Sequence, residues 1–214
     1  PSFSVDGRRI GEGEWTTVDG STGRVFAGQA RLVPPSLSGH YARLMEWADD
    51  RRHMRVRVNA DTPADAHRGR DFGAEGIGLY RTEFHYLRAQ GLPTEDELFE
   101  DYREVVEIIA PNPVTVRTLD LGGDRFSSEI SWTKETNPAL GLRAIRFCLQ
   151  QPKLFKSQLR AILRASAYGN VQVMFPMISG LQELLDSRKM LKEVMVELDQ
   201  EGVSYDRDIK VGLM

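Results

Sequence analysis

The stretch GAEGIGLYRTEF at residues 73–84 decides the fold of this chain. Its apolar run ends in Arg-Thr-Glu, which predicts a buried strand with charged residues at its carboxyl end. The same pattern returns in PVTVRTLD at residues 113–120. Parallel strands of an α/β fold bring their carboxyl ends to one rim, and ligands bind at that rim. We therefore expect Arg81 and Arg117 to share a rim. The alternative is that each arginine is only the salt-bridged end of its strand.

The composition is that of an ordinary globular protein. Apolar residues make up 41% of the 214 residues and charged residues 28%, which is enough to bury a core. The formal net charge of −3 provides no basic footprint for a nucleic acid. The single cysteine excludes an internal disulfide framework and fits a reducing compartment. No apolar run approaches the length of a membrane helix and the first residues show no signal-peptide pattern, so we expect a cytoplasmic protein with no membrane partner.

Residues 1–34 differ in composition from the rest of the chain, because glycine is frequent there. The turn signal DGSTG at residues 19–23 separates two short apolar runs, which predicts a β-hairpin. Pro34-Pro35 is a stiff break and a plausible domain boundary. A helix with Tyr41 and Leu44 on its apolar face follows.

From residue 54 onward, strand and helix patterns alternate. Strands are expected at residues 54–61, 73–84, 114–119, 171–178 and 209–214. Helices are expected at residues 62–70, 94–109, 137–149, 152–168 and 179–201. Capping boxes of Thr94 with Glu97 and of Ser179 with Gln182 mark two helix starts, and Gly202 ends the last helix.

This order predicts an α/β fold, with a parallel sheet covered by helices. A closed (β/α)8 TIM barrel needs eight strands and about 250 residues, whereas this pattern supplies five strands. We therefore expect a partial barrel preceded by a short β-hairpin. A complete five-stranded, doubly wound sheet is the alternative.

The proposed rim carries a cluster of permanent cations. Arg143, in the helix after the long loop, would join Arg81 and Arg117 there. Guanidinium groups match carboxylate and phosphate oxygens with paired hydrogen bonds and keep their proton. Each such contact contributes about 4 kcal/mol at an effective dielectric constant of about 20. Glu83 and Asp120 could hold the guanidinium groups in orientation. The spacing therefore favours a small ligand with several negative charges, such as a phosphorylated carboxylate.

Other kinds of site find little support in the sequence. The Gly76-Ile77-Gly78 segment lacks the third glycine of a dinucleotide fingerprint and opens a strand. The four histidines show no metal-ligand spacing. Cys148 lies within a helical apolar pattern and reads as a core residue. We therefore expect the histidines and Cys148 to be surface or packing residues, and we expect no dinucleotide fingerprint at Gly76-Ile77-Gly78.

Five motifs carry a resemblance to a known family. They are GAEGIGLYRTEF (73–84), VRTLDLGGD (116–124), NPALGLRAIR (137–146), QLRAILRASAYG (158–169) and MFPMI (174–178). They resemble the phosphoenolpyruvate-utilising enzymes, which include enzyme I of the sugar phosphotransferase system, pyruvate phosphate dikinase and phosphoenolpyruvate synthase. The resemblance covers nearly the whole chain. Residues 37–83 are similar to the dikinase, whereas the sequence from Phe84 onward is similar to enzyme I.

The resemblance implies two domains and a reaction. Residues 1–34 look like the tail of a swivelling phosphohistidine domain, and residues 35–214 look like the first part of a phosphoenolpyruvate-binding TIM barrel. The family transfers the phosphoryl group of phosphoenolpyruvate to a histidine. We expect an enzyme I-like phosphoenolpyruvate-protein phosphotransferase. The alternatives are a dikinase or synthase fragment and, in another class, a non-catalytic anion-binding module or a plain structural domain.

The resemblance also implies the site and its partners. Arg81 and Arg117 correspond to residues that bind the substrate's phosphate, and Arg143 to a residue of the same anion site. The family uses Mg²⁺. Its metal-binding acids, its phosphorylated histidine and its proton-donating cysteine are expected outside this chain, and Cys148 does not match that cysteine. The chain alone should therefore be inactive. The partners implied are phosphoenolpyruvate and pyruvate, a phosphocarrier protein, and a second copy in a homodimer.

Overall fold

The computed structural model describes residues 2–5, 7–33, 38–88, 92–122 and 141–214. The chain divides into two compact units, Pro1–His53 and Met54–Met214, which we describe one at a time. The domain boundary predicted at Pro34-Pro35 lies outside the described residues and stays a prediction.

The first unit contains two antiparallel hairpins. Strand β1 pairs with β2, and β3 pairs with β4, over Ser2–Val5, Arg8–Gly11, Thr16–Asp19 and Arg24–Ala27. The second hairpin is the predicted one. Its turn is held by Asp19, whose carboxylate accepts the backbone N–H of Ser21 at 2.9 Å. The first hairpin was not predicted, although Asp6-Gly7 is a common two-residue turn sequence.

Helix α1, Gly39–Arg51, also belongs to the first unit. It begins after Ser38, and none of its residues is buried. Tyr41, Leu44 and Trp47 are all exposed. The amphipathic pattern therefore forms the helix without giving it a buried face.

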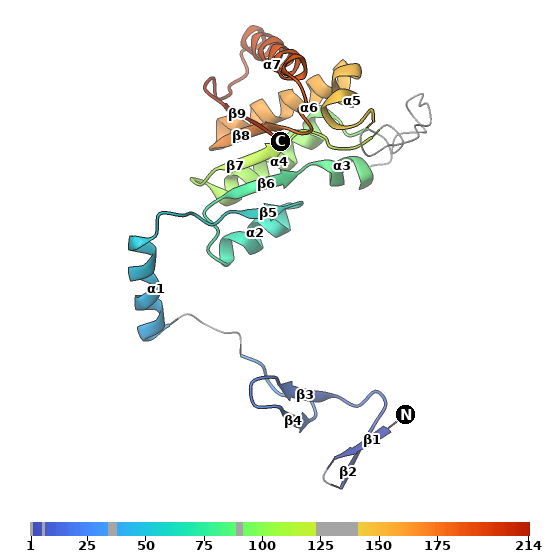
Figure 1. The fold of residues 1–214 in the computed structure, drawn as a ribbon, viewed down its shortest axis with the longest axis vertical. Coiled ribbons are helices and arrows are strands. Elements are labelled where there is room, and N and C mark those ends of the chain that lie inside the picture. Colours follow the sequence, from blue (N-terminus) through green and yellow to red (C-terminus); the bar gives the residue numbers. More distant parts are fainter. Residues whose placement is uncertain (1, 6, 34–37, 89–91, 123–140) are drawn as a thin grey trace. The chain divides into compact units, whose positions relative to one another are not determined.

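The second unit is built on one parallel sheet of five strands. The strands lie side by side in chain order (Figure 1), and they are β5 Val58–Ala60, β6 Ile77–Arg81, β7 Val114–Arg117, β8 Val171–Phe175 and β9 Lys210–Leu213. A doubly wound sheet requires a reversal of strand order, and this sheet has none. The sequential order is that of a partial (β/α)8 barrel. The predicted fold class is confirmed, and the doubly wound alternative is wrong.

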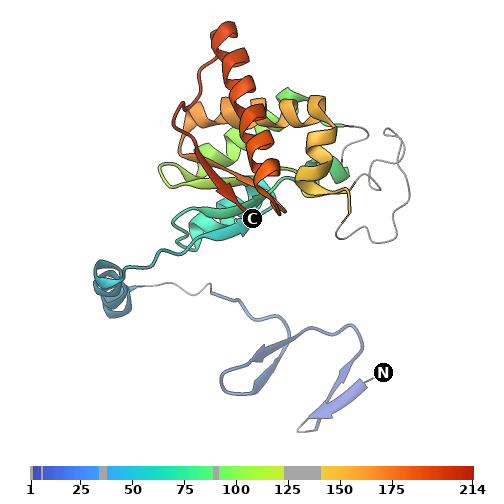
Figure 2. The ribbon, with the colours of Figure 1, turned by 45° about the horizontal axis from the view of Figure 1, so that its top comes forward.

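The helices of this unit form a layer beside the sheet. The principal ones are α2 Pro63–Asp71, α4 Glu95–Ile109, α6 Pro152–Ala165 and α7 Leu181–Glu201. Each packs against the next in this series, and Figure 2 shows α4, α6 and α7 on one side of the strands. Shorter helices complete the unit, namely α3 Glu83–Arg88, α5 Ala144–Gln150 and the 3-10 turn Ser166–Tyr168.

The core lies between the sheet and this helix layer. Strand β8 shows the alternation most clearly, because Val171, Val173 and Phe175 are buried whereas Gln172 and Met174 are only half-buried. The buried residues form a single apolar cluster that extends from β5 to α7. The opposite face of the sheet is more polar. That face corresponds to the inside of a barrel.

The helix starts show one prediction confirmed and one wrong. The Thr94 hydroxyl accepts the N–H of Glu97 at 3.3 Å, and the Glu97 carboxylate accepts the N–H of Thr94 at 2.8 Å, as in the predicted capping box. Helix α7 begins at Leu181, so its third position is Glu183 rather than Gln182. Glu183 Oε2 accepts the N–H groups of Ser179 and Gly180 at 2.7 and 3.2 Å. The predicted box was therefore displaced by one residue.

Several further elements are shorter than predicted. The strand expected at residues 73–84 covers only Ile77–Arg81, and Glu83 already begins helix α3. The strand expected at residues 54–61 is reduced to Val58–Ala60, because the residues before it lie at the sheet edge and Val56 donates its N–H to the Glu75 carboxylate instead. The helix expected at residues 137–149 begins at Ala144 among the described residues. Its predicted cap, Asn137-Pro138, and the loop predicted at residues 125–136 lie outside them.

The capping box can be tested by mutation. We expect Thr94→Ala to lower the free energy of unfolding by about 1 kcal/mol, because the N–H of Glu97 loses its acceptor. Urea denaturation of the purified chain measures this loss. Ser157→Ala, inside α6, is the control and should cause no comparable loss, since alanine is the better helix former. Equal losses in the two variants would contradict the capping role.

Candidate functional site

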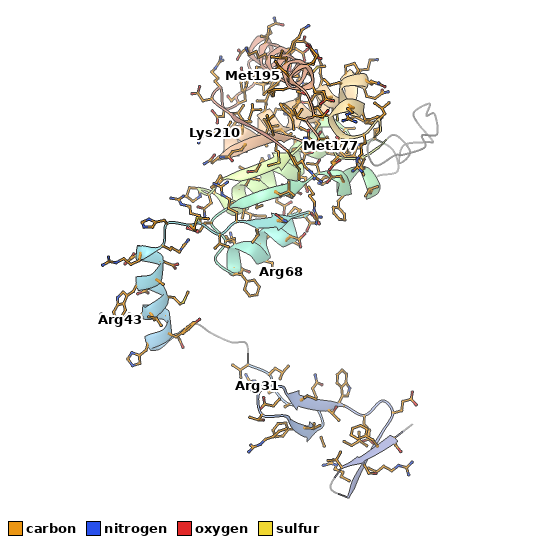
Figure 3. All side chains as sticks on the ribbon, in the orientation of Figure 1. Arg31, Arg43, Arg68, Met177, Met195 and Lys210 are labelled. Carbon is orange, nitrogen blue, oxygen red and sulfur yellow. The ribbon has the colours of Figure 1, made fainter. Side chains whose placement is uncertain are left out.

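The carboxyl ends of β6 and β7 carry the two predicted arginines. Arg81 is the last residue of β6 and Arg117 the last residue of β7, and the two are paired in the parallel register. Figure 3 labels Met177, just beyond β8, and Lys210, the first residue of β9, at opposite ends of the sheet. The arginines lie at the Met177 end. The expectation that they share a rim is confirmed.

Arg143 reaches the same rim from the start of α5. A β-bridge joins Arg143 to Gly122, in the segment that follows β7. The next residue, Ala144, is fully buried, has a left-handed φ of 52° and donates its N–H to the Leu121 carbonyl at 3.0 Å. Non-glycine residues rarely adopt this conformation. The backbone at Arg143 is therefore held against the loop after β7.

Asp120 joins Arg117 and Arg143. Its Oδ2 lies 3.1 Å from Nη1 of Arg117, and its Oδ1 accepts a hydrogen bond from Nη2 of Arg143 at 2.9 Å. The same Arg143 nitrogen also donates to the Asp120 backbone carbonyl at 3.2 Å. One carboxylate therefore brings two guanidinium groups together at the rim.

Glu83 holds Arg117 from the other side. As the first residue of α3, it directs Oε1 to Nη2 of Arg117 at 2.8 Å, and this oxygen also accepts the N–H of Asp120 at 3.1 Å. The Arg117 side chain is only 10% exposed. Among the described residues, Glu83 Oε2, Arg117 Nε and Arg143 Nε are buried and have no hydrogen-bond partner. The cluster thus retains polar atoms that its own contacts leave unused.

Arg81 makes a separate pair with Asp61. Its Nε and Nη2 each donate to one Asp61 oxygen at 2.5 Å. These hydrogen bonds raise the pKa of Arg81 above its usual value. The Arg81 side chain is 45% exposed, so it is the most accessible of the three arginines. Arg81 therefore lies on the shared rim but has its own carboxylate.

Asp61 was not predicted as a partner of Arg81. A signal was present, because Asp61 follows β5 directly, just as Arg81 and Arg117 end the next two strands. The carboxyl ends of all three parallel strands meet at one rim, so Asp61 could have been predicted there.

The positive charges of the three arginines are compensated within the protein. Arg81, Arg117 and Arg143 are balanced by carboxylates of Asp61, Glu83 and Asp120. Folding therefore does not require a bound anion between the arginines. Arginine has five N–H donors, so donors remain for an anion beside the internal pairs.

The remaining candidates behave as packing residues. Cys148 is fully buried, and this burial raises the pKa of its thiol. His85 lies 2.8 Å from the Asp101 carboxylate, which also accepts a hydrogen bond from the Tyr80 hydroxyl at 2.5 Å. The histidine is thereby tied to α4 and not to the arginine rim.

The described part of the chain has neither a metal-binding cluster nor a membrane-spanning helix. Within residues 2–5, 7–33, 38–88, 92–122 and 141–214, no group of three or more metal-ligating side chains could hold an ion. No helix in these ranges has the length and the apolar character needed to cross a membrane.

Stability measurements can distinguish the two types of ion pair. Glu83→Gln should lower the free energy of unfolding by about 3 kcal/mol, because a buried guanidinium loses a charged partner. Asp61→Asn, the matched change at an exposed pair, should cost about 1 kcal/mol or less. Urea denaturation of both variants provides the comparison. A larger loss for Asp61→Asn would show that the buried pair is not the dominant one.

The reactivity of Cys148 provides a second test. Because the thiol is buried with a raised pKa, a thiol reagent should label the folded chain only as fast as the chain unfolds. Raising the pH through the ordinary thiol pKa of about 8.5 should speed labelling of the urea-unfolded chain but not of the folded chain. Rapid, pH-dependent labelling of the folded chain would contradict the buried assignment.

Comparisons with known proteins identify the family. Residues 36–214 match a family described as "PEP-utilising enzyme, PEP-binding domain". The phosphoenolpyruvate-protein phosphotransferase of Priestia megaterium is 48% identical over 167 residues, which are 78% of this chain and 29% of that protein. The proteins of the same name from Geobacillus stearothermophilus and Bacillus subtilis are 41% and 39% identical, over 96% of this chain and 38% of each relative. This chain spans 29% to 38% of the length of these relatives. It belongs to the family of phosphoenolpyruvate-utilising enzymes.

Proposed function

We propose that this chain is the phosphoenolpyruvate-binding part of an enzyme I-like phosphoenolpyruvate-protein phosphotransferase. One observation of the structure carries the proposal. The guanidinium groups of Arg117 and Arg143 meet on Asp120 at the carboxyl rim of the sheet, with Arg81 at the end of the adjacent strand. The names of the relatives support this reading over the dikinase and synthase alternatives.

The substrate carries a phosphate and a carboxylate, and the three arginines can serve both. Phosphoryl transfer depends chiefly on positioning and on neutralising charge. Glu83 and Asp120 hold Arg117 in place before the substrate arrives, so that the site need not reorganise during the reaction. Arginine has five N–H donors, and the internal pairs use only part of those of Arg117 and Arg143.

Arg81 has a different part in this proposal. Its pair with Asp61 is exposed, and exposed pairs contribute little stability. A phosphate oxygen can therefore take the place of an Asp61 oxygen at low cost. The reaction breaks the bond between the phosphorus and the enol oxygen and forms a bond from phosphorus to a histidine nitrogen. The enolate that leaves takes up a proton at its methylene carbon and becomes pyruvate.

The described residues do not form a Mg²⁺ site. Mg²⁺ prefers carboxylate oxygens, but the rim carboxylates of Asp61, Glu83 and Asp120 are engaged by arginines. These carboxylates are therefore not assigned as Mg²⁺ ligands. We propose that the Mg²⁺ ligands, the phosphorylated histidine and the proton-donating cysteine all lie outside these 214 residues, and that the chain alone is inactive.

The domain and partner assignments are also proposals. Residues 1–34 would be the tail of the swivelling domain and residues 35–214 the first part of the barrel, in a cytoplasmic enzyme that serves a phosphocarrier protein. The homodimer is the oligomeric state that the family resemblance implies.

A non-catalytic anion-binding module, or a domain whose arginines are all structural, would show the same ion pairs. Turnover distinguishes these alternatives. In the intact protein supplied with phosphoenolpyruvate and Mg²⁺, Arg117→Ala should remove about 3 kcal/mol of transition-state stabilisation, as loss of a positioned donor does. The value of kcat/KM for phosphohistidine formation should therefore fall by about a hundredfold. Labelling with [³²P]phosphoenolpyruvate measures the rate.

Arg207→Ala is the matched control. Arg207 is also ion-paired, with Asp199, but lies in the segment before β9, at the opposite end of the strands. Its rate should equal that of the wild type. A wild-type rate in Arg117→Ala, or a wild-type protein that forms no phosphohistidine, would overturn the proposed function.

A further inference from the structure

A set of buried hydrogen bonds joins helix α6 to the carboxyl ends of β6 and β7, behind the arginine rim. The proposed function does not account for these hydrogen bonds. Their centre is Gln158 of α6, which is fully buried. Gln158 Oε1 accepts the N–H of Leu119 at 2.9 Å. Gln158 Nε2 donates to the hydroxyls of Thr82 and Tyr102 at 3.0 and 3.3 Å. Thr82 in turn donates its hydroxyl hydrogen to the carbonyl of Arg117 at 3.0 Å. We name these contacts the Gln158 bracket.

The orientation of the Gln158 amide follows from chemistry. The backbone N–H of Leu119 can only donate, so the amide atom beside it must be the oxygen. The nitrogen then faces Thr82 and Tyr102, and both of its hydrogens have acceptors. Thr82 accepts from Gln158 and donates to Arg117. An amide in an apolar layer is tolerated when its polar atoms are satisfied in this way.

The bracket begins where the backbone pairing ends. The β6–β7 register ends with the pair Arg81 and Arg117. Thr82 is the next residue after Arg81, and its side chain points to the helix layer because successive side chains alternate. Its hydrogen bond to the Arg117 carbonyl therefore joins the two strands one step beyond their last pair. Leu119, two residues after Arg117, is held by the same glutamine.

We infer that Gln158 is a positioning residue that fixes the separation of Arg81 and Arg117, so that both guanidinium groups engage one phosphoenolpyruvate anion. This inference rests on the proposed function. Gln158 touches neither guanidinium group in the described structure and acts only through Thr82 and the backbone. A displacement of about 1 Å between groups that bind one ligand reduces the rate by up to about a hundredfold. Gln158 was not predicted as a site residue, since it lies in a stripe of apolar residues on α6.

The experiment uses the intact phosphotransferase and steady-state kinetics with phosphoenolpyruvate. Gln158→Met removes the amide at similar volume, and Thr82→Val removes the hydroxyl at similar shape. Each should lower kcat/KM for phosphoenolpyruvate between about tenfold and about a hundredfold, chiefly through a higher KM, because the two arginines bind the substrate before it reacts. Because the two residues belong to one chain of hydrogen bonds, the double variant should lose little more than either single variant. Thr82→Ser keeps the hydroxyl and should restore most of the lost affinity.

Ser166→Ala controls for loss of stability alone. Ser166 is also buried and makes two hydrogen bonds, to the Leu163 carbonyl at 2.6 Å and from the Asp206 N–H at 2.8 Å, but at the far end of α6. It should lower Tm without changing KM. All variants are assayed well below their Tm, and the Thr82→Val and Thr82→Ser pair decides the outcome if Gln158→Met does not fold.

The outcomes separate the two proposals. If Arg117→Ala loses activity but Thr82→Val keeps the KM of the wild type, the rim binds the substrate and the bracket inference is wrong. The inference is also wrong if Thr82→Ser is as impaired as Thr82→Val, or if Ser166→Ala raises KM equally. If Arg117→Ala behaves as the wild type, the proposed function fails, and the bracket inference fails with it.

Discussion

The burial of the Arg117 guanidinium is the constraint on which the rim of this sheet depends. A permanent charge that is nearly excluded from water must be paired, and breaking such a pair destabilises the protein strongly. Glu83 and Asp120 supply the pairing, so the start of α3 and the loop after β7 are tied to the end of one strand. Arg143 joins through the second oxygen of Asp120. The order of the whole cluster follows from the placement of one arginine.

The two faces of the sheet contribute differently to this rim. Arg81 and Thr82 are adjacent in the chain, so their side chains point in opposite directions. The arginine takes part in the charged face, whereas the threonine enters the helix layer and meets Gln158. The apolar core and the charged rim are therefore connected through single backbone steps. The sequential strand order makes this possible, because the helices follow the same order, with α2 against β5, α4 against β7 and α6 against β8.

Much of the architecture could be predicted because its signals are local. The alternation of apolar runs, the Thr94–Glu97 box and Gly202 act over a few residues, and the structure confirms them. The placement of Arg81 and Arg117 at one rim followed from the general property that parallel strands end together. The shift of one residue at the start of α7 shows where local signals are insufficient. Gln182 and Glu183 are both residue types that can complete a capping box. Glu183 accepts the N–H of Ser179, whereas Gln182 donates to Asp186 within the helix.

The sequence by itself determined the order of strands and helices, the family resemblance and the three arginines, because each of these is encoded in short motifs. Only the tertiary structure decided how the arginines are paired. Asp61 lies 20 residues from Arg81, Glu83 lies 34 from Arg117, and Gln158 lies 76 from Thr82. No periodic pattern links residues so far apart. Their contacts arise because the β-α crossovers bring strand ends and helix faces together, and a buried charge or amide is stable only where its partners converge.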